Sequence, residues 1–212
     1  MAVRSHVSYS AAMLALPEHV PPLALGFAAG LRHAMDGDHL VAMATIVRRE
    51  RSLFRSMVFG GFWGLGHTLS LLVAGLAMIL IGSPVPHAWS RGLELAVAVM
   101  LVGLGITAIV RRTKPIPAMP DRRRPFAVGI LHGLAGSGAM ALVVLASTRS
   151  PWIGLLTIGL FGLGSIGGMM AVSAVFAVPF TRVHPGRMES WARLLIGATS
   201  IAFGIYYGIE AA

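Results

Sequence analysis

The sequence predicts an all-α integral membrane protein with six transmembrane helices arranged as two inverted three-helix repeats. Three observations support this fold class: an apolar composition, six long apolar stretches, and a similarity between the two halves of the chain. Hydrophobic residues make up 56% of the chain and charged residues only 12%, whereas a soluble domain carries about 25% charged residues. The mean hydropathy of +0.77 agrees, so we expect the apolar surface to face lipid.

Six stretches are long and apolar enough to be transmembrane helices, which need about 20 mainly apolar residues. These stretches are 23–47, 57–81, 92–110, 126–147, 153–180 and 191–209. The first is polar in its middle, and we expect it to be kinked or locally unwound near Gly37. Such interruptions are tolerated in a membrane when neighbouring groups satisfy the freed backbone.

The distribution of Lys and Arg predicts the orientation of these helices. Of the 17 basic residues, 13 fall in or beside three loops on one side, three fall on the other side, and Arg32 lies within a span. Because basic loops stay in the cytoplasm, both termini are predicted to be extracytoplasmic, in a protein of the cytoplasmic membrane. The net charge of +9 then reflects topology and contact with anionic lipid, and we do not interpret it as a nucleic-acid-binding surface.

The two halves of the chain match at a nearly constant offset. His132 follows His33 by 99 residues, and Ser165 follows His67 by 98 residues. With three spans per half, the second half is inserted upside down, an arrangement that recurs in secondary transporters with a site between the repeats. We therefore divide the chain into an N-terminal extracytoplasmic segment, 1–22, a first repeat, 23–110, a basic cytoplasmic linker, 111–125, and a second repeat, 126–212.

A polar cluster interrupts the first apolar stretch, where residues 32–39 read Arg-His-Ala-Met-Asp-Gly-Asp-His. Ionisable residues inside a membrane are costly and usually functional. Imidazole suits Ni, Co, Cu and Zn, and the absence of Cys argues against a Cu(I) site. We predict a His/Asp site for a divalent metal. The alternative is a polar network that joins helices without a metal.

The geometry of this cluster depends on whether the helix is continuous. At about 100° per residue, Asp36 lies roughly 60° from both His33 and His39, while Asp38 points away from them. A break at Gly37 would relax these angles and allow all four side chains to converge. Arg32 either neutralises one of the two carboxylates or extends outward.

Two further histidines lie in the middle of predicted spans. His67 is either a ligand or a hydrogen-bond donor to a neighbouring carbonyl, and the adjacent glycines would bring it towards the first span. His132 is open to the same two interpretations. The metal-site candidates are therefore His33, Asp36, Asp38, His39 and His67, with His132 as a further candidate. The second half lacks matching acids, so we expect it to be a packing and gating partner.

Several enzymatic activities are excluded by missing motifs. The sequence contains no Gly-Lys-Ser/Thr phosphate-binding loop and no His-Glu-x-x-His zinc-protease motif. We expect a protein that is not an enzyme, that has no permanent cofactor and that does not hydrolyse ATP.

At these residues the chain resembles the nickel/cobalt transporter superfamily. The signature His-x4-Asp-His of that family is matched by His33, Asp38 and His39, and its Gly-His-Ser/Thr motif by 66–68. The family usually has Ala at the position of Gly37. The resemblance implies that His33, Asp38 and His39 are metal-site residues, with Asp36 and His67 adjoining them.

The second half points to one branch of this superfamily. Larger members carry an acidic Gly-Phe-Asp-Thr-Ala-Thr-Glu stretch, where this chain has Gly-Ser-Ile-Gly-Gly-Met-Met at 164–170. With the segment 131–137, this resembles the shorter branch of urease-accessory nickel permeases, over nearly the whole chain from Leu23.

The resemblance implies secondary transport of Ni²⁺, and also of Co²⁺, as substrate. Uptake is the favoured direction, and the histidines offer a route for proton coupling. The alternatives are efflux of these ions, another ion such as Mn²⁺ or Zn²⁺, a non-conducting accessory protein that delivers nickel to a metalloenzyme, and a structural membrane subunit. Possible partners are a second copy of the chain and urease or hydrogenase maturation proteins.

Overall fold

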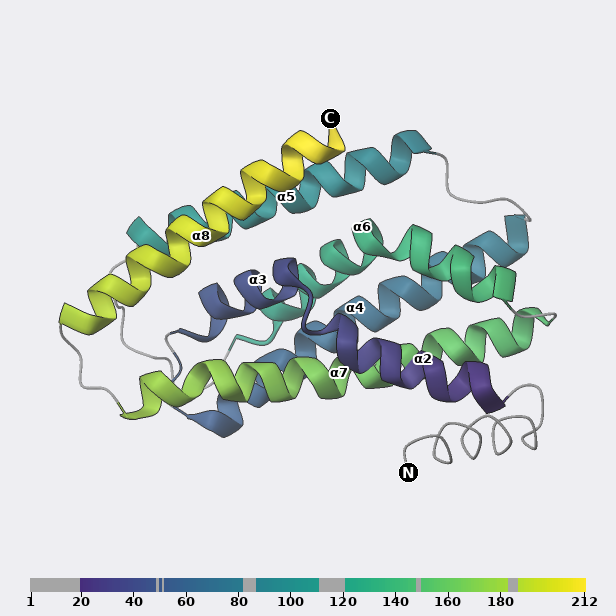
Figure 1. Ribbon diagram of the computed structural model, residues 1–212, viewed down its shortest axis with the longest axis horizontal. Helices are drawn as coiled ribbons and strands as arrows, with labels where there is room; N and C mark the ends of the chain where they lie inside the picture. The colour runs from purple at the N-terminus through teal and green to yellow at the C-terminus, as the bar shows by residue number, and fades with distance from the viewer. Residues whose placement is uncertain are drawn as a thin grey trace, which may run out of the picture.

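Every regular element of the described residues is a helix in the computed structural model (Figure 1). The structure describes residues 20–48, 50, 52–81, 87–110, 121–147, 150–182 and 187–212. The helices are α2 (Val20–His33), α3 (Gly37–Val47), α4 (Leu53–Ile81), α5 (His87–Val110), α6 (Arg123–Ser147), α7 (Pro151–Arg182) and α8 (Arg187–Ala211). Most of the expected N-terminal segment, 1–22, and of the linker, 111–125, lies outside the described residues.

The first apolar stretch is broken where the sequence suggested. The backbone N–H groups of Met35 and Asp36 donate to the carbonyls of Arg32 and His33, at 2.9 and 3.0 Å. These bonds reach back three residues, which tightens the end of α2 into a 3₁₀-type turn. Asp36 then takes an extended backbone conformation (φ −65°, ψ 147°) and is the N-cap of α3, which begins at Gly37.

The helices pack as a set of long pairs. α4 packs along both α6 and α7, α2 packs along α7, and α5 packs along α8. In Figure 1 the α5–α8 pair forms the upper layer, and the short helix α3 lies between it and α7. The broken first stretch therefore places the ends of α2 and α3 in the interior of the bundle.

Glycines allow the closest of these crossings. A Cβ on Gly30 of α2 would collide with the backbone of α7 at Phe161, and a Cβ on Gly129 of α6 would collide with the backbone of α4 at Trp63. Gly129 follows Gly30 by 99 residues, and Phe161 follows Trp63 by 98 residues. Small residues of this kind let helix backbones approach closely in membranes.

A second pair of crossings follows the same offset. Gly66 of α4 meets the backbone of Phe126 in α6, and Gly164 of α7 meets the backbone of Phe27 in α2. The glycines beside His67 were expected to bring it towards the first span, and its ring centroid lies 5.2 Å from that of His33. The spacing of the glycines predicts which face of α4 packs closely against another helix. The helix on the Gly66 side of that face is α6, because α2 packs along α7 instead.

The outer surface is apolar, as expected of a protein in lipid. Leu80 is 76% exposed, Trp152 is 78% exposed and Val99 is 72% exposed, although soluble proteins rarely leave large apolar patches uncovered. Among the residues that the structure describes, four helices are long and apolar enough to cross a membrane by length and composition: Leu53–Ile81, Trp89–Val110, Pro151–Thr181 and Glu189–Ala211. The chain fits a multi-pass membrane protein, and the count of six spans stays a prediction.

Candidate metal centre

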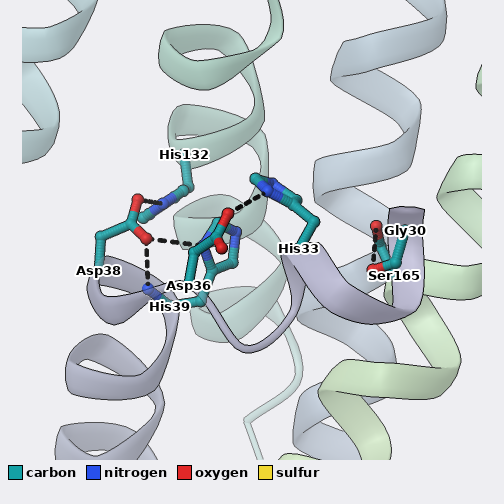
Figure 2. A network of polar contacts seen from close by, with 7 residues as sticks. All are labelled: Gly30, His33, Asp36, Asp38, His39, His132 and Ser165. Carbon is teal, nitrogen blue, oxygen red and sulfur yellow. Dashed lines mark hydrogen bonds and ion pairs between the residues drawn. The ribbon is translucent and has the colours of Figure 1, made fainter. Parts of the chain in front are cut away.

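Asp36 and His33 form the first polar contact at the helix break. The side chain of Asp36 makes no capping hydrogen bond to α3. Its Oδ2 instead accepts a hydrogen bond from Nδ1 of His33, at 2.7 Å (Figure 2). The Asp36 side chain is 48% exposed. On an ideal helix it would lie between the two histidines, but the break leaves it in contact with only one of them.

Asp38 joins two histidines from different halves of the chain. Its Oδ1 accepts from Nδ1 of His39 at 3.0 Å, and its Oδ2 accepts from Nε2 of His132 at 2.8 Å (Figure 2). Oδ1 also accepts from the backbone N–H of His39 at 2.9 Å. An acidic residue in the first turn of a helix is favoured by the helix dipole. The break at Gly37 therefore turns inward a carboxylate that a continuous helix would point away.

Four imidazoles from four helices gather around His39. The ring centroid of His39 in α3 lies 4.4 Å from that of His33 in α2, 5.3 Å from that of His67 in α4 and 4.2 Å from that of His132 in α6. The structure thus brings all four sequence-predicted histidines together. His132 is a full member of the cluster, although its half of the chain lacks matching acids.

The cluster contains buried nitrogens that have no protein partner. His39 and His67 are each 1% exposed and His132 is 2% exposed. Nε2 of His39, both ring nitrogens of His67 and Nδ1 of His132 make no hydrogen bond within the described residues. Buried polar atoms in proteins are nearly always hydrogen-bonded, because leaving one unpaired costs about 1–3 kcal/mol. Their concentration at one point suits a ligand that accepts several lone pairs.

Two groups of three side chains have the spacing of a metal site. His33, His39 and His67 form one group, and Asp38, His39 and His132 form the other; within each group the ligand atoms lie within 4.8 Å of one another. Neutral imidazole and carboxylate together suit borderline divalent cations. The hydrogen bonds that the histidines donate to Asp36 and Asp38 match the carboxylate–histidine contacts that orient metal ligands and raise their basicity.

A cavity of about 490 Å³ opens beside this cluster. Its lining includes Asp38, His39 and His132, together with Phe203 and Tyr207 of α8. Arg32 also lines it, and no ion pair joins this exposed guanidinium to a carboxylate among the residues that the structure describes. Of the two roles considered for Arg32, extension outward agrees with this placement.

The aromatic walls of the site were missed by the sequence analysis. Trp63 is fully buried and stacks on His39 with ring centroids 5.9 Å apart and an interplanar angle of 14°. It lies four residues before His67 and therefore on the same face of α4. This spacing is the one feature of the sequence that could have placed Trp63 beside the histidines. Phe203 and Tyr207 come from the last helix and carry no such signal.

Ser165 occupies the place in α7 that matches His67 in α4. Its Oγ donates to the carbonyl of Gly30 at 3.2 Å (Figure 2). Gly30 lies one turn before the end of α2, so this bond supports the turn that positions His33. At matching positions of the two halves, His67 thus contributes an imidazole to the cluster, and Ser165 contributes a hydroxyl that donates a hydrogen bond to α2.

The amino-acid sequence of this chain is similar to those of three known proteins considered below. The chain is 37% identical over 209 residues to the urease accessory protein UreH of Bacillus sp. (strain TB-90), covering 87% of this chain and 89% of that relative. It is 25% identical over 174 residues to the Chloroplast protein FOR GROWTH AND FERTILITY 1 of Arabidopsis thaliana and 24% identical over 160 residues to the Chloroplast protein FOR GROWTH AND FERTILITY 2. These alignments cover 70% and 66% of this chain but only 47% and 43% of the chloroplast proteins.

A family described as the transmembrane region of cytochrome C biogenesis proteins matches residues 103–206, from α5 into α8. No solved structure matches the chain. The similarity to UreH covers 87% of this chain and 89% of that relative. The chain therefore belongs to the UreH family of urease accessory proteins, which confirms the short branch identified from its motifs.

Proposed function

We propose that the chain is a secondary transporter that takes up Ni²⁺, and also Co²⁺, across the cytoplasmic membrane through the His/Asp cluster. It acts as a carrier and not as an enzyme. The loops with 13 basic residues face the cytoplasm, and both termini are extracytoplasmic.

The observation that carries this proposal is the meeting of four imidazoles at a helix break inside the bundle. The four histidines come from four different helices, and His39, His67 and His132 have buried ring nitrogens without a hydrogen-bond partner among the described residues. An imidazole-rich set without thiolate suits Ni²⁺ and Co²⁺ better than Mg²⁺ or Ca²⁺, which prefer oxygen ligands. Polar groups this costly to bury in a membrane protein mark ion pathways.

The arrangement of the helices supports an alternating-access mechanism. We propose that residues 23–110 and 126–212 are inverted repeats, because the glycine crossings that join the two halves come in pairs, and exchanging the halves at offsets of 98 and 99 residues converts one crossing of a pair into the other. In transporters of this design, broken helices line the substrate site and the two repeats move against each other around it. The break between α2 and α3 supplies such a broken helix in the first repeat, and the second repeat contributes His132 to the site.

The membrane potential is sufficient to drive uptake without ATP. A charge moving through an inside-negative potential gains about 2.3 kcal/mol per 100 mV, and a divalent ion gains roughly twice that. This corresponds to an accumulation of more than 10³-fold at 100 mV, because each 1.4 kcal/mol is a factor of ten. Efflux would have to be coupled to another gradient.

A second candidate is a membrane accessory protein that binds nickel and delivers it to urease maturation without conducting it. The name of the Bacillus relative, a urease accessory protein, favours a link with urease. Both candidates use the same metal site, and only transport requires the ion to cross the membrane.

Radioactive nickel uptake into proteoliposomes that contain only this chain separates the two candidates. We expect uptake that rises when an inside-negative potential is imposed and that unlabelled Co²⁺ inhibits. Protein-free vesicles are the control. Nickel that binds to the proteoliposomes but is fully removed by an external chelator contradicts transport and favours the accessory role.

A further inference from the structure

His39 is common to both groups of potential ligands, and its two ring nitrogens have different surroundings. Nδ1 donates to Oδ1 of Asp38, and because a carboxylate only accepts hydrogen bonds, Nδ1 carries the proton. Nε2 then has the free lone pair, and it is buried with no partner among the described side chains. The same reasoning leaves a free lone pair on Nδ1 of His132, whose Nε2 donates to Asp38.

The two groups differ in their chemistry. We call His33, His39 and His67 the imidazole site, and Asp38, His39 and His132 the carboxylate site. The imidazole site offers three neutral nitrogen ligands. The carboxylate site includes a negative charge, which attracts an approaching cation and tolerates a partly hydrated one better than imidazole does.

The two sites also differ in access. Every member of the carboxylate site lines the cavity of about 490 Å³. Of the imidazole site, His33 and His39 line the cavity, but His67 does not, and it is 1% exposed. An ion coming from the cavity therefore meets the carboxylate site first, while His67 lies deeper, on α4.

His39 cannot serve both sites at once, because a neutral imidazole has one lone pair. It binds at the carboxylate site through Nδ1 once an incoming cation replaces the hydrogen bond to Asp38 and the proton moves to Nε2, and at the imidazole site through Nε2 when Nδ1 again donates to Asp38. Resting on the proposed transport function, we propose that one divalent cation occupies the two sites in turn, entering at the carboxylate site and moving to the imidazole site, with His39 as the shared ligand. Asp38 has a second role in this sequence, because its bonds to His39 and His132 hold their free nitrogens in place once the ion has moved on.

Metal binding by the full chain in detergent tests the two sites separately from transport. Co²⁺ is the probe, because its visible absorption reports the type and number of its ligands. We expect the wild type to bind one Co²⁺ per chain. His132→Ala keeps the imidazole site, and we expect it to retain the wild-type Co²⁺ spectrum and to bind within about tenfold of the wild type, while nickel uptake falls more than tenfold.

His67→Ala keeps the carboxylate site, and we expect it to bind one Co²⁺ about 10–100-fold more weakly and with a changed spectrum. The double variant His67→Ala/His132→Ala loses binding more than 100-fold. His132→Gln provides a second test, because its amide can still donate to Asp38 but does not replace the imidazole ligand. It should match His132→Ala in both readouts.

Several results would overturn the two-site proposal. These are two Co²⁺ ions bound per wild-type chain, an equal loss of binding in His67→Ala, His132→Ala and His39→Ala, or a His67→Ala spectrum identical to that of the wild type. Each of them leaves transport intact if the wild type still carries nickel into vesicles. Conversely, variants that bind as expected in a chain that moves no nickel support the two sites and contradict the proposed transport.

Discussion

Asp38 and His132 lie 94 residues apart in the sequence, and a 2.8 Å hydrogen bond joins Oδ2 of the first to Nε2 of the second. The bond links the first turn of α3 to the middle of α6, and so links the two halves of the chain at the metal centre. The same carboxylate holds His39 through its other oxygen. A side chain that a continuous helix would point away from the site is therefore its central hydrogen-bond acceptor.

The two carboxylates of the cluster are expected to differ sharply in their contribution to nickel affinity. Asp38 uses a different oxygen for each histidine, and Asp38→Asn replaces one of them with an NH2 group that only donates. We therefore predict a 10–100-fold loss of nickel affinity, as is typical when a group that orients a metal ligand is removed. Asp36→Asn changes a half-exposed contact to His33 alone. Because exposed pairs contribute about 1 kcal/mol or less, its loss should be at most about fivefold.

Nickel titrations of the two purified variants, read by equilibrium dialysis, measure this difference. Asp38→Glu is the matched control, because it restores both acceptor oxygens and should recover part of the affinity. Equal losses in the two Asn variants would show that the hydrogen bonds of Asp38 have no special role.

Gly37 is predicted to be required because of the ring of Phe203. A Cβ at Gly37 would lie 2.9 Å from Cζ of that ring, which lines the same cavity. Gly37→Ala should lower stability by about 1–3 kcal/mol through overpacking. In detergent this appears as a lower Tm, and the double variant Gly37→Ala/Phe203→Leu should regain most of it. A double variant no more stable than Gly37→Ala would place the strain elsewhere.

The glycine crossings are predicted to tolerate no side chain. Gly30→Ala and Gly129→Ala each bring a Cβ against a backbone carbonyl, of Phe161 and Trp63 respectively. Because backbone atoms cannot move aside cheaply, we expect both variants to lower the Tm strongly or to reduce the yield of folded protein.

Gly103→Ala and Gly159→Ala are the matched controls for this test, because a Cβ at either position has no neighbour within 4 Å. Alanine is favoured over glycine inside a helix by roughly 0.5–1 kcal/mol, so these variants should be neutral or slightly stabilised. A similar drop in all four variants would mean that helix propensity or membrane insertion, and not close packing, governs the result.

Much of the metal centre was predictable because polar residues are rare inside apolar spans. His33, Asp38 and His39 stood out against their surroundings, and the offset of 99 residues directed attention to His132. The break near Gly37 was expected from the same polar run. These features are local or depend on a repeat, so the sequence carries them directly.

The features that could not be predicted from the sequence depend on which helices pack together. Spacing identifies Gly66 as a close-packing residue but does not reveal that its neighbour is Phe126. In the same way, Phe203 and Tyr207 have no ligand chemistry of their own, and only the packing of α8 places them along the cavity. A continuous helix would put Asp36 between His33 and His39, whereas in the broken helix its side chain bonds to His33.

The most direct test of the account is radioactive nickel uptake by proteoliposomes containing the His39→Ala variant. His39 contacts every other imidazole of the cluster, so its loss should reduce uptake to the level of protein-free vesicles. Ser56→Ala is the matched control, because Ser56 is also fully buried and its hydroxyl donates to the local carbonyl of Ser52, away from the histidine cluster. The account predicts full uptake in Ser56→Ala and none in His39→Ala, and wild-type uptake in a folded His39→Ala protein would contradict it.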